Sequence, residues 1–427
     1  MLNGCYHMKK KSSTMDLSLS ANERLFLDSD SPFKPKKYKN YLPNGFKIYT
    51  FHAGFKKASS DLLIIIFDQK VNSVNVFSKT FTPSAPIIWD KKNVKGMVKA
   101  LIVNSGNANA HTGKAGINII EKYVNFLSKK IECKKNEILV SSTGVIGEIF
   151  DPKLIINQIN KIKLDKNTDL FDAAKSIMTT DTYPKISVQN IKIGNISFKA
   201  YGIAKGSGMI QPNMATMLAY IFIEIDVPKN LLKKIIHNNI EQTFNSISVD
   251  SDTSTSDTLS IFSIKNKFIN LKNIKNFKLL NSKIHNLMKD LSQQVIKDGE
   301  GITKLIEVTV KNAKTKKQAK QIGFSIVNSP LVKTAISGED ANWGRVIMAI
   351  GKSEENINQN KIKIYFGNNL VCTNGEKYKK IKINNLNNYM KNKVIKIIVY
   401  IENGKQHFTV FGNDLSYEYI RINGDYR

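Results

Sequence analysis

The amino-acid sequence predicts a mixed α/β protein, because short runs of β-forming residues alternate with amphipathic helical patterns along the chain. Apolar runs rich in branched residues predict strands at 62–67, 100–103, 217–225, 258–264, 305–310 and 397–401. Apolar residues at helical spacing predict helices near 116–130, 153–163, 229–243, 283–297 and 343–351. The helix at 229–243 follows Pro228, a residue type favoured in the first turn of a helix.

The chain has the composition of a folded protein. Its 427 residues are 41% apolar and 23% charged, which is typical of a globular chain and not of a disordered one. This length gives ample core for two or three domains, or for one large composite domain. Residues 1–40 are polar and basic with little apolar periodicity, so we expect a loose N-terminal extension. The Lys/Asn-rich stretches at 265–282 and 373–393 predict surface excursions.

The sequence excludes several classes of protein. Its three scattered cysteines, Cys5, Cys133 and Cys372, are too few for a disulfide scaffold or a zinc knuckle. The longest aliphatic run, near Leu62–Ile66, is far shorter than a membrane span. The basic N-terminus is not followed by an apolar core and therefore does not resemble a secretory signal. We expect a cytoplasmic enzyme or binding protein.

The net charge of +29, from 64 basic and 35 acidic side chains, raises nucleic-acid binding as an alternative. The lysines are spread over the whole chain and mostly accompany Asn and Ile, as at 264–278. The sequence contains no RNP-type aromatic motif, zinc-finger spacing or basic-region heptad. A solvated basic surface is therefore the favoured interpretation, and specific nucleic-acid binding stays a minority alternative.

The familiar catalytic motifs are missing as well. The six histidines form no HExxH motif, no GxSxG elbow occurs, and the glycines match neither a P-loop nor a dinucleotide fingerprint, so we predict no metal and no nucleotide cofactor. Instead, segments rich in Gly, Ser, Thr and Asn adjoin apolar runs at 104–113, 141–147, 178–185, 204–218, 248–258, 298–301 and 338–345. Such residues let backbone N–H groups approach a substrate, although each segment taken alone is more often an ordinary turn.

The segment AKGSGMIQPNMATML, residues 204–218, suggests a specific chemistry. Its glycines and Pro212 predict a loop that runs into a strand, with Thr216 at the junction. Thr216 is either a packing residue or the new N-terminus left by a cut at the Ala215–Thr216 bond. A free α-amine titrates near ~8 and can act as the base for the hydroxyl of the same threonine.

These residues resemble a known family. KGSGMIQPNMATML is similar to the self-cleavage segment of the glutamate N-acetyltransferase/ornithine acetyltransferase family of arginine biosynthesis. NSGNANA, STGVIG, MTTDTYPK, SVDSDTSTSDT, DGEGITKLIEV, SPLVKTAISGEDANWGR and DLSYEYIRINGDYR resemble further segments of the family, in the family's order. They cover the chain from about residue 54 to its end, so the chain is identified as a member.

The resemblance implies a self-cleaving sandwich of the N-terminal-nucleophile type. After the extension 1–40, residues 41–215 would form an α chain and residues 216–427 a β chain. The two intertwined chains would stay associated, commonly as two copies of each. Thr216 would take the acetyl group from N2-acetylornithine and pass it to glutamate, a ping-pong transfer without a cofactor. Some members also accept acetyl-CoA as the donor, and the sequence leaves this choice open.

The resemblance also assigns the site residues. The Thr143 hydroxyl and the Gly144 backbone N–H would form the oxyanion hole, although without the family a structural turn is the favoured reading of STGVIG. The residues that match substrate-binding positions are Thr182, Lys205, Thr216, Glu300 and Asn423, with Thr179 as a weaker candidate. Taken alone, a lysine or glutamate here is more often a surface charge.

Two departures from the family pattern affect these expectations. The family usually has a Ser or Thr five residues after Asn423, whereas the given sequence stops at Arg427, so we expect substrate binding weaker by about 1 kcal/mol. His111 stands where the family often has cysteine, which we interpret as neutral packing. The nucleophile and oxyanion segments are intact, so we expect an active enzyme.

Other functions stay open at this point. A related N-terminal-nucleophile aminopeptidase or amidase would use the same threonine but give the acyl group to water. A basic nucleic-acid-binding protein would bind a duplex with an affinity that falls steeply as the salt concentration rises. This affinity would not depend on Thr216. A decayed homologue would fold and remain uncut.

Overall fold

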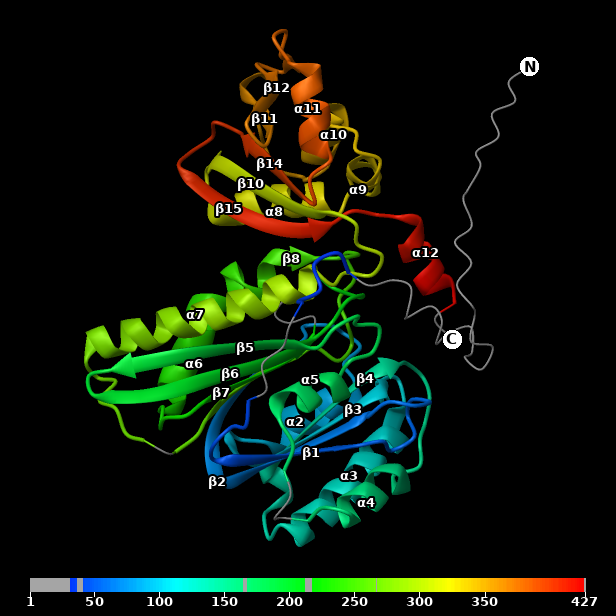
Figure 1. The fold of residues 1–427 in the computed structure, drawn as a ribbon, viewed down its shortest axis with the longest axis vertical. Coiled ribbons are helices and arrows are strands. Elements are labelled where there is room, and N and C mark those ends of the chain that lie inside the picture. The colour runs from blue at the N-terminus through cyan, green and yellow to red at the C-terminus, as the bar shows by residue number, and fades with distance from the viewer. Residues whose placement is uncertain (1–30, 37–40, 164–166, 212–216, 266, 426–427) are drawn as a thin grey trace.

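The first of two β-sheets combines strands from both halves of the sequence. The computed structural model describes residues 31–36, 41–163, 167–211, 217–265 and 267–425. The strand order in this eight-stranded sheet is β4-β3-β2-β9-β7-β6-β5, and β1 also pairs with β2 (Figure 1). Its strands are β1 (Phe46–Phe51), β2 (Leu62–Phe77), β3 (Met97–Asn107), β4 (Ile138–Val145), β5 (Lys185–Ile193), β6 (Ile196–Lys205), β7 (Leu218–Ile223) and β9 (Thr258–Ser263).

The long strand β2 divides this sheet into two parts. Its first half pairs with β1 and β3, and Asn72–Phe77 pairs with β9 after an irregularity between Ile66 and Val71. The two parts enclose one aromatic core, in which Phe46, Phe67 and Phe262 surround Phe222. Alternate residues of a strand face opposite sides. The residues on the outer face of each part are apolar as well, and helices cover them.

Helices cover the outer faces of both parts, which gives a helix–sheet–sheet–helix sandwich (Figure 1). On the β1–β4 part lie α2 (Ala85–Asn93), α3 (Gly113–Lys130) and α4 (Lys153–Asn160). On the β5–β7 part lie α6 (Lys229–Asn239) and α7 (Ile274–Ile296). The short α5 (Leu170–Ser176) packs into the central core between the parts. The predicted α/β class and sandwich architecture are confirmed.

The second sheet forms a smaller unit that packs beside α7 (Figure 1). Its seven strands have the order β13-β12-β11-β14-β10-β15-β8. They are β8 (Ile247–Ser248), β10 (Leu305–Ala313), β11 (Lys363–Phe366), β12 (Asn369–Thr373), β13 (Glu376–Lys377), β14 (Val394–Tyr400) and β15 (Gln406–Asn413). Its helices are α8 (Lys316–Val327), α9 (Pro330–Ser337), α10 (Trp343–Gly351) and α11 (Ile383–Met390), and α12 (Tyr417–Gly424) follows β15. The two-residue β8 joins this sheet to the first unit.

The prediction that 265–282 is a surface excursion is wrong for its second half. Helix α7 begins at Ile274, after Asn273 accepts a hydrogen bond from the Lys275 backbone N–H. Phe277 and Leu280 are buried on its inner face. The lysines and asparagines around them, Lys275, Asn276, Lys278 and Asn281, are exposed or half-buried, and their number concealed the apolar periodicity. No helix within the described ranges has the length and apolarity needed to cross a membrane.

The aromatic core gives the first testable prediction. Phe222 is fully buried, with its ring 4.5 Å from that of Phe46 and 5.2 Å from that of Phe262. Phe222→Ala should lower the free energy of unfolding by about 3–5 kcal/mol, because truncation leaves a cavity. A urea titration measures this. Phe268→Ala is the matched control, since Phe268 is 76% exposed, and a loss comparable to that of Phe222→Ala there would contradict the assignment of the core.

Candidate functional site

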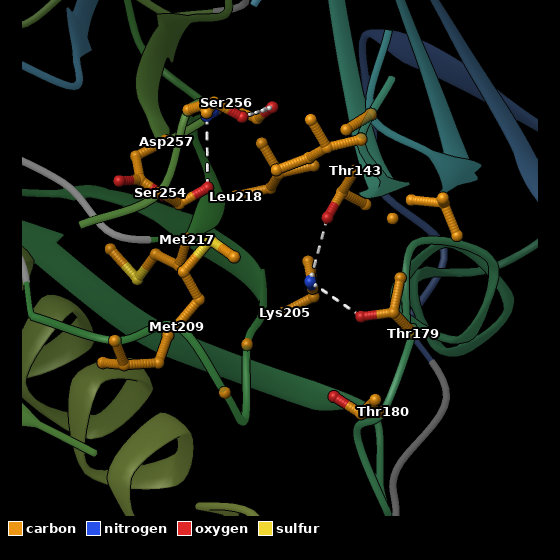
Figure 2. Close-up of a pocket in the computed structure, with 18 of the residues that line it drawn as sticks. Thr143, Thr179, Thr180, Lys205, Met209, Met217, Leu218, Ser254, Ser256 and Asp257 are labelled. Atoms are coloured by element: carbon orange, nitrogen blue, oxygen red, sulfur yellow. Dashed lines mark hydrogen bonds between the residues drawn. The ribbon is translucent and has the colours of Figure 1, made fainter. Parts of the chain in front are cut away.

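Five of the small polar segments meet around one cavity of about 300 Å³ (Figure 2). They are the end of β4, the loop before β5, the loop after β6, the loop before β9 and the loop after α7. The segment at 104–113 adds only Ala108, and the last turn of α12 adds Asn423. The fold therefore joins segments that composition alone could not place in one site.

Thr143 and Gly144 lie at the end of β4, where the chain runs beside β3. Gly106 pairs with Gly144, and both glycines have positive φ, +110° and +125°. A Cβ on Gly144 would lie 2.3 Å from the Gly106 carbonyl carbon, so only glycine fits there. The NSGNANA segment thus supports the strand that carries the predicted oxyanion residues. Both Thr143 and Gly144 line the cavity.

Lys205 ends β6 and points into the cavity. Its ammonium group donates to the hydroxyl oxygens of Thr143, at 3.0 Å, and Thr179, at 2.9 Å (Figure 2). Lys205 is only 9% exposed, and this burial lowers its pKa below the ordinary value, while the nearby charge of Asp181 opposes the shift. No ion pair of Lys205 is present among the described residues, so its positive charge has only neutral hydrogen-bond partners.

Glu300 contributes a second buried charge to the cavity. Burial raises the pKa of its carboxyl group, and hydrogen bonds from Thr180 and Asn423 oppose the shift. The Asn423 amide donates to Glu300 Oε2 at 2.8 Å. A Cβ on Gly208 would lie 2.4 Å from the same carboxyl group, so this glycine leaves the space that the carboxylate occupies. The predicted residues Glu300 and Asn423 are therefore in direct contact.

The helix that carries Asn423 is fastened to the loop that carries Glu300. Asp414 accepts hydrogen bonds from the backbone N–H groups of Thr303 and Lys304, both at 2.9 Å. The Ser416 hydroxyl donates to the Gly301 carbonyl oxygen at 2.6 Å. Both contacts join the β15–α12 connection to the segment directly after Glu300, which explains how a residue so far along the chain reaches the cavity.

Thr182 is placed differently from the other predicted residues. Its backbone N–H and its hydroxyl both donate to the Asp298 carboxylate, and it is not among the residues that line the cavity, whereas Thr179 and Thr180 are. The substrate-binding role of Thr182 stays a prediction. Thr180, whose hydroxyl is 2.6 Å from that of Ser207, was not singled out, since three threonines in TTDT gave no signal for which one faces the cavity.

Ala215 and the predicted nucleophile Thr216 lie outside the described residues. Their neighbours Met217 and Leu218 line the cavity, and the Met217 carbonyl oxygen accepts from the Thr258 backbone N–H at 2.8 Å. Met217, the second residue after the predicted cut, therefore lies at the cavity. Within the described part of the chain, no group of three or more His, Cys, Asp or Glu side chains is arranged to hold a metal ion.

Comparison with known proteins gives the family. The model of the ArgJ family matches residues 47–427. The arginine biosynthesis bifunctional protein ArgJ of Rhizobium meliloti is 40% identical over 93% of this chain and 99% of its own length. The protein of the same name from Bartonella henselae is 42% identical over 90% of this chain and 95% of its own length.

Two solved structures are also similar. One is the arginine biosynthesis bifunctional protein of Bacillus halodurans, with 32% identity and a TM-score of 0.45, covering 48% of this chain and 97% of its own. The other is the ornithine acetyltransferase of Mycobacterium tuberculosis, crystallised with ornithine, with 26% identity and a TM-score of 0.35, covering 40% of this chain and 94% of its own. From the match of the family model and the identity to curated relatives over nearly the whole chain, this protein belongs to the ArgJ family.

Proposed function

We propose that this chain transfers the acetyl group of N2-acetylornithine to glutamate through an acetyl ester on Thr216. Membership of the ArgJ family makes the chain an acyltransferase of arginine biosynthesis. The observation that supports the substrate class is the pair of buried charges in the cavity, the ammonium group of Lys205 and the carboxyl group of Glu300.

Each of these charges is destabilised by burial and lacks a counter-charge in direct contact among the described residues. Leaving a charge buried and unpaired is expensive. A substrate with an α-carboxylate and a side-chain ammonium group would supply both missing partners. We assign Lys205 to the carboxylate and Glu300 to the ammonium group, so that the bound substrate would give each buried charge a partner of opposite sign.

The chemistry that we propose at the acetyl group of the substrate follows from Thr143 and Gly144. Attack of the Thr216 hydroxyl on the acetyl carbonyl creates an oxyanion, which needs hydrogen-bond donors aimed at it. The Thr143 hydroxyl accepts a hydrogen bond from Lys205, so its own proton is free to point toward an oxyanion. The α-amine of Thr216 would take the hydroxyl proton and return it to the leaving amine of ornithine. The amino group of glutamate then attacks the acetyl ester, which gives N-acetylglutamate and returns the free Thr216 hydroxyl.

The interleaved sheet supports the proposal of two associated chains. A cut before Thr216 leaves residues 41–215, with the N-terminal extension 1–40, as one chain and 216–427 as the other. In the first sheet, β7 and β9 of the second chain lie between β2 and β6 of the first. The chains would therefore stay hydrogen-bonded along two strand pairs. We further propose two copies of each chain in the assembly, no cofactor, and acetyl-CoA as a second acetyl donor.

The nucleophile is tested first by self-cleavage. Wild-type protein should give two fragments of nearly equal length on a denaturing gel, with intact masses of residues 1–215 and 216–427. Thr216→Ala should remain whole, because the attacking hydroxyl is absent. Thr82→Ala, at an exposed threonine, is the matched control and should be cut normally. A wild-type chain that stays at 48.1 kDa after prolonged incubation would contradict the mechanism.

The role of Glu300 is tested by Glu300→Gln, which keeps the size and the acceptor for Asn423 but removes the charge. We expect kcat/KM for N2-acetylornithine to fall at least about tenfold, since an unpaired buried charge costs about 2–5 kcal/mol. Steady-state assays of acetyl transfer to glutamate measure this. The exposed Glu132→Gln is the control. Equal kcat/KM values for Glu300→Gln and wild type would remove Glu300 from the substrate site.

Gly208 offers an independent test of the same carboxylate. The Cβ of Gly208→Ala would clash with the Glu300 carboxyl group. This group is the far end of a flexible side chain and can move away, so the fold should tolerate the change. We expect KM for N2-acetylornithine to rise about tenfold, as for a loss of about 1.4 kcal/mol, with little change in the thermal midpoint. Gly351→Ala, where a Cβ meets nothing within 4 Å, should match wild type. An unchanged KM for Gly208→Ala would refute the proposed position of the ammonium group.

A further inference from the structure

The charged side chains of the cavity are unequal in number. Within the described part of the chain, the cavity is lined by one cation, Lys205, and two acids, Asp257 and Glu300 (Figure 2). A ligand with one carboxylate and one ammonium group matches this set. A ligand with two carboxylates finds only one cation, and its second carboxylate faces an acid.

The two amino acids of the proposed reaction therefore place opposite demands on the same cavity. Ornithine and glutamate have the same α-groups, but the side chain of one ends in an ammonium group and that of the other in a carboxylate. In the proposed function Lys205 binds the α-carboxylate of each, so both side chains extend toward Glu300. An ionised Glu300 attracts the ammonium group and repels the carboxylate. A ping-pong transfer nevertheless requires both to bind in turn.

Glu300, and not Asp257, is the acid whose carboxyl oxygens are open to a ligand. The Glu300 backbone N–H donates to the Ser207 carbonyl oxygen at 2.9 Å, which fixes the residue beside Gly208. A Cβ on Gly208 would lie 2.4 Å from Glu300 Oε2 and 2.5 Å from Oε1, so the glycine leaves both oxygens uncovered on this side. Asp257 is 2% exposed and its Oδ2 is covered by protein.

The charged and titratable groups around Glu300 come from three elements. They are Lys205 at the end of β6, Asp250 between β8 and β9, and Tyr419 on α12. Burial raises the pKa of Glu300, hydrogen bonds oppose this shift, the charge of Asp250 adds to it and the charge of Lys205 opposes it. Burial also raises the pKa of Tyr419, so its hydroxyl group stays neutral. These opposing influences leave the charge on Glu300 sensitive to the charge of the ligand.

We propose that Glu300 is a carboxylate when it binds the side-chain ammonium group of ornithine or N2-acetylornithine, and a neutral acid when it binds the side-chain carboxylate of glutamate. The inference rests on the proposed function. As ornithine binds, Glu300 gives any proton that it carries to the solvent. As glutamate binds, an ionised Glu300 takes a proton from the solvent, and its O–H donates to the carboxylate of the ligand. Two neighbouring carboxyl groups that share one proton avoid the repulsion of two ions. One residue therefore recognises both side chains.

The test is the binding of ornithine and of glutamate to the wild-type protein, measured by titration calorimetry in buffers that differ in ionisation enthalpy. Between pH ~5.5 and ~7 the side chains of both ligands keep their charges, and their α-groups are the same. The protons exchanged on binding should therefore differ by about one between the two ligands, with more uptake for glutamate. The ratio of the Kd for glutamate to the Kd for ornithine should accordingly rise about tenfold per pH unit.

Two matched variants locate the proton. Glu300→Gln has an amide that donates to a carboxylate at any pH. It should keep the Kd for glutamate within about threefold of wild type, weaken ornithine binding at least about tenfold and abolish the difference of one proton. Asp257→Asn removes the other acid of the cavity and should preserve that difference. The titrations of the wild-type protein decide the proposal even if Glu300→Gln does not fold.

Equal proton exchange for the two ligands in the wild-type protein would overturn the proposal. A difference of one proton that persists in Glu300→Gln, or that disappears in Asp257→Asn, would overturn it as well. If neither amino acid binds to the wild-type protein, the proposed substrate site itself fails, and the inference fails with it. Binding without the difference in protons overturns only the inference, so the two failures are distinguishable.

Discussion

A buried cation, Lys185, holds together the segments on which the cavity depends. Its ammonium group lies 2.6 Å from Asp181 Oδ1 and 2.6 Å from Asp298 Oδ2, and all three side chains are completely buried. Asp181 also accepts from the backbone N–H groups of Gly206, at 2.7 Å, and Thr179, at 2.9 Å. Burying ions costs several kcal/mol each and is compensated only by close pairing. The cluster therefore fixes the loop before β5, the end of β6 and the loop after α7 relative to one another.

This cluster also explains why the neighbouring charges of the cavity remain available. Lys185 has two carboxylates of its own, and Asp181 and Asp298 are saturated by Lys185 and by hydrogen-bond donors around them. Lys205 and Glu300, each carried by a segment that the cluster anchors, are bonded only to hydroxyl and amide groups. A rigid frame that is satisfied internally can hold less satisfied charges in place for a ligand. Such preorganisation reduces the ordering cost of binding.

The sequence predicted several of the residues that line the cavity, and their roles in the reaction stay predictions. Thr143, Gly144, Lys205, Glu300 and Asn423 meet around one cavity, as their place in family-like segments suggested. Spacing could not show that Thr182 bonds to Asp298 while Thr179 bonds to Lys205, because the direction of these side chains is set by the buried Lys185 cluster. Nor could it single out Asp257, since three aspartates occur in SVDSDTSTSDT and only the start of β9 selects the one that faces the cavity.

The fold elements that the sequence missed have a common physical cause. Strands β5 and β6 and the first turns of α7 carry lysine, asparagine and glutamine on their solvent side, which weakens the apolar contrast that periodicity depends on. Helices α8, α9 and α12 are short and mixed in composition. Their starts are nevertheless encoded locally, since Thr315, Ser329 and Ser416 accept from first-turn backbone N–H groups. Such caps specify a helix end but are too common to identify a helix alone.

If the chain is cut before Thr216 as we propose, the interleaved sheet constrains when that cut can occur. The cavity needs β7 and β9 in place, because they position Asp257 and the chain at Met217 beside Lys205 at the end of β6. Cutting before these strands pair would separate two halves that must meet again through long-range contacts, which is slow. Cutting afterwards leaves β7 and β9 hydrogen-bonded to β6 and β2. We therefore expect the proposed cut to follow the pairing of these strands, when the two chains can no longer separate easily.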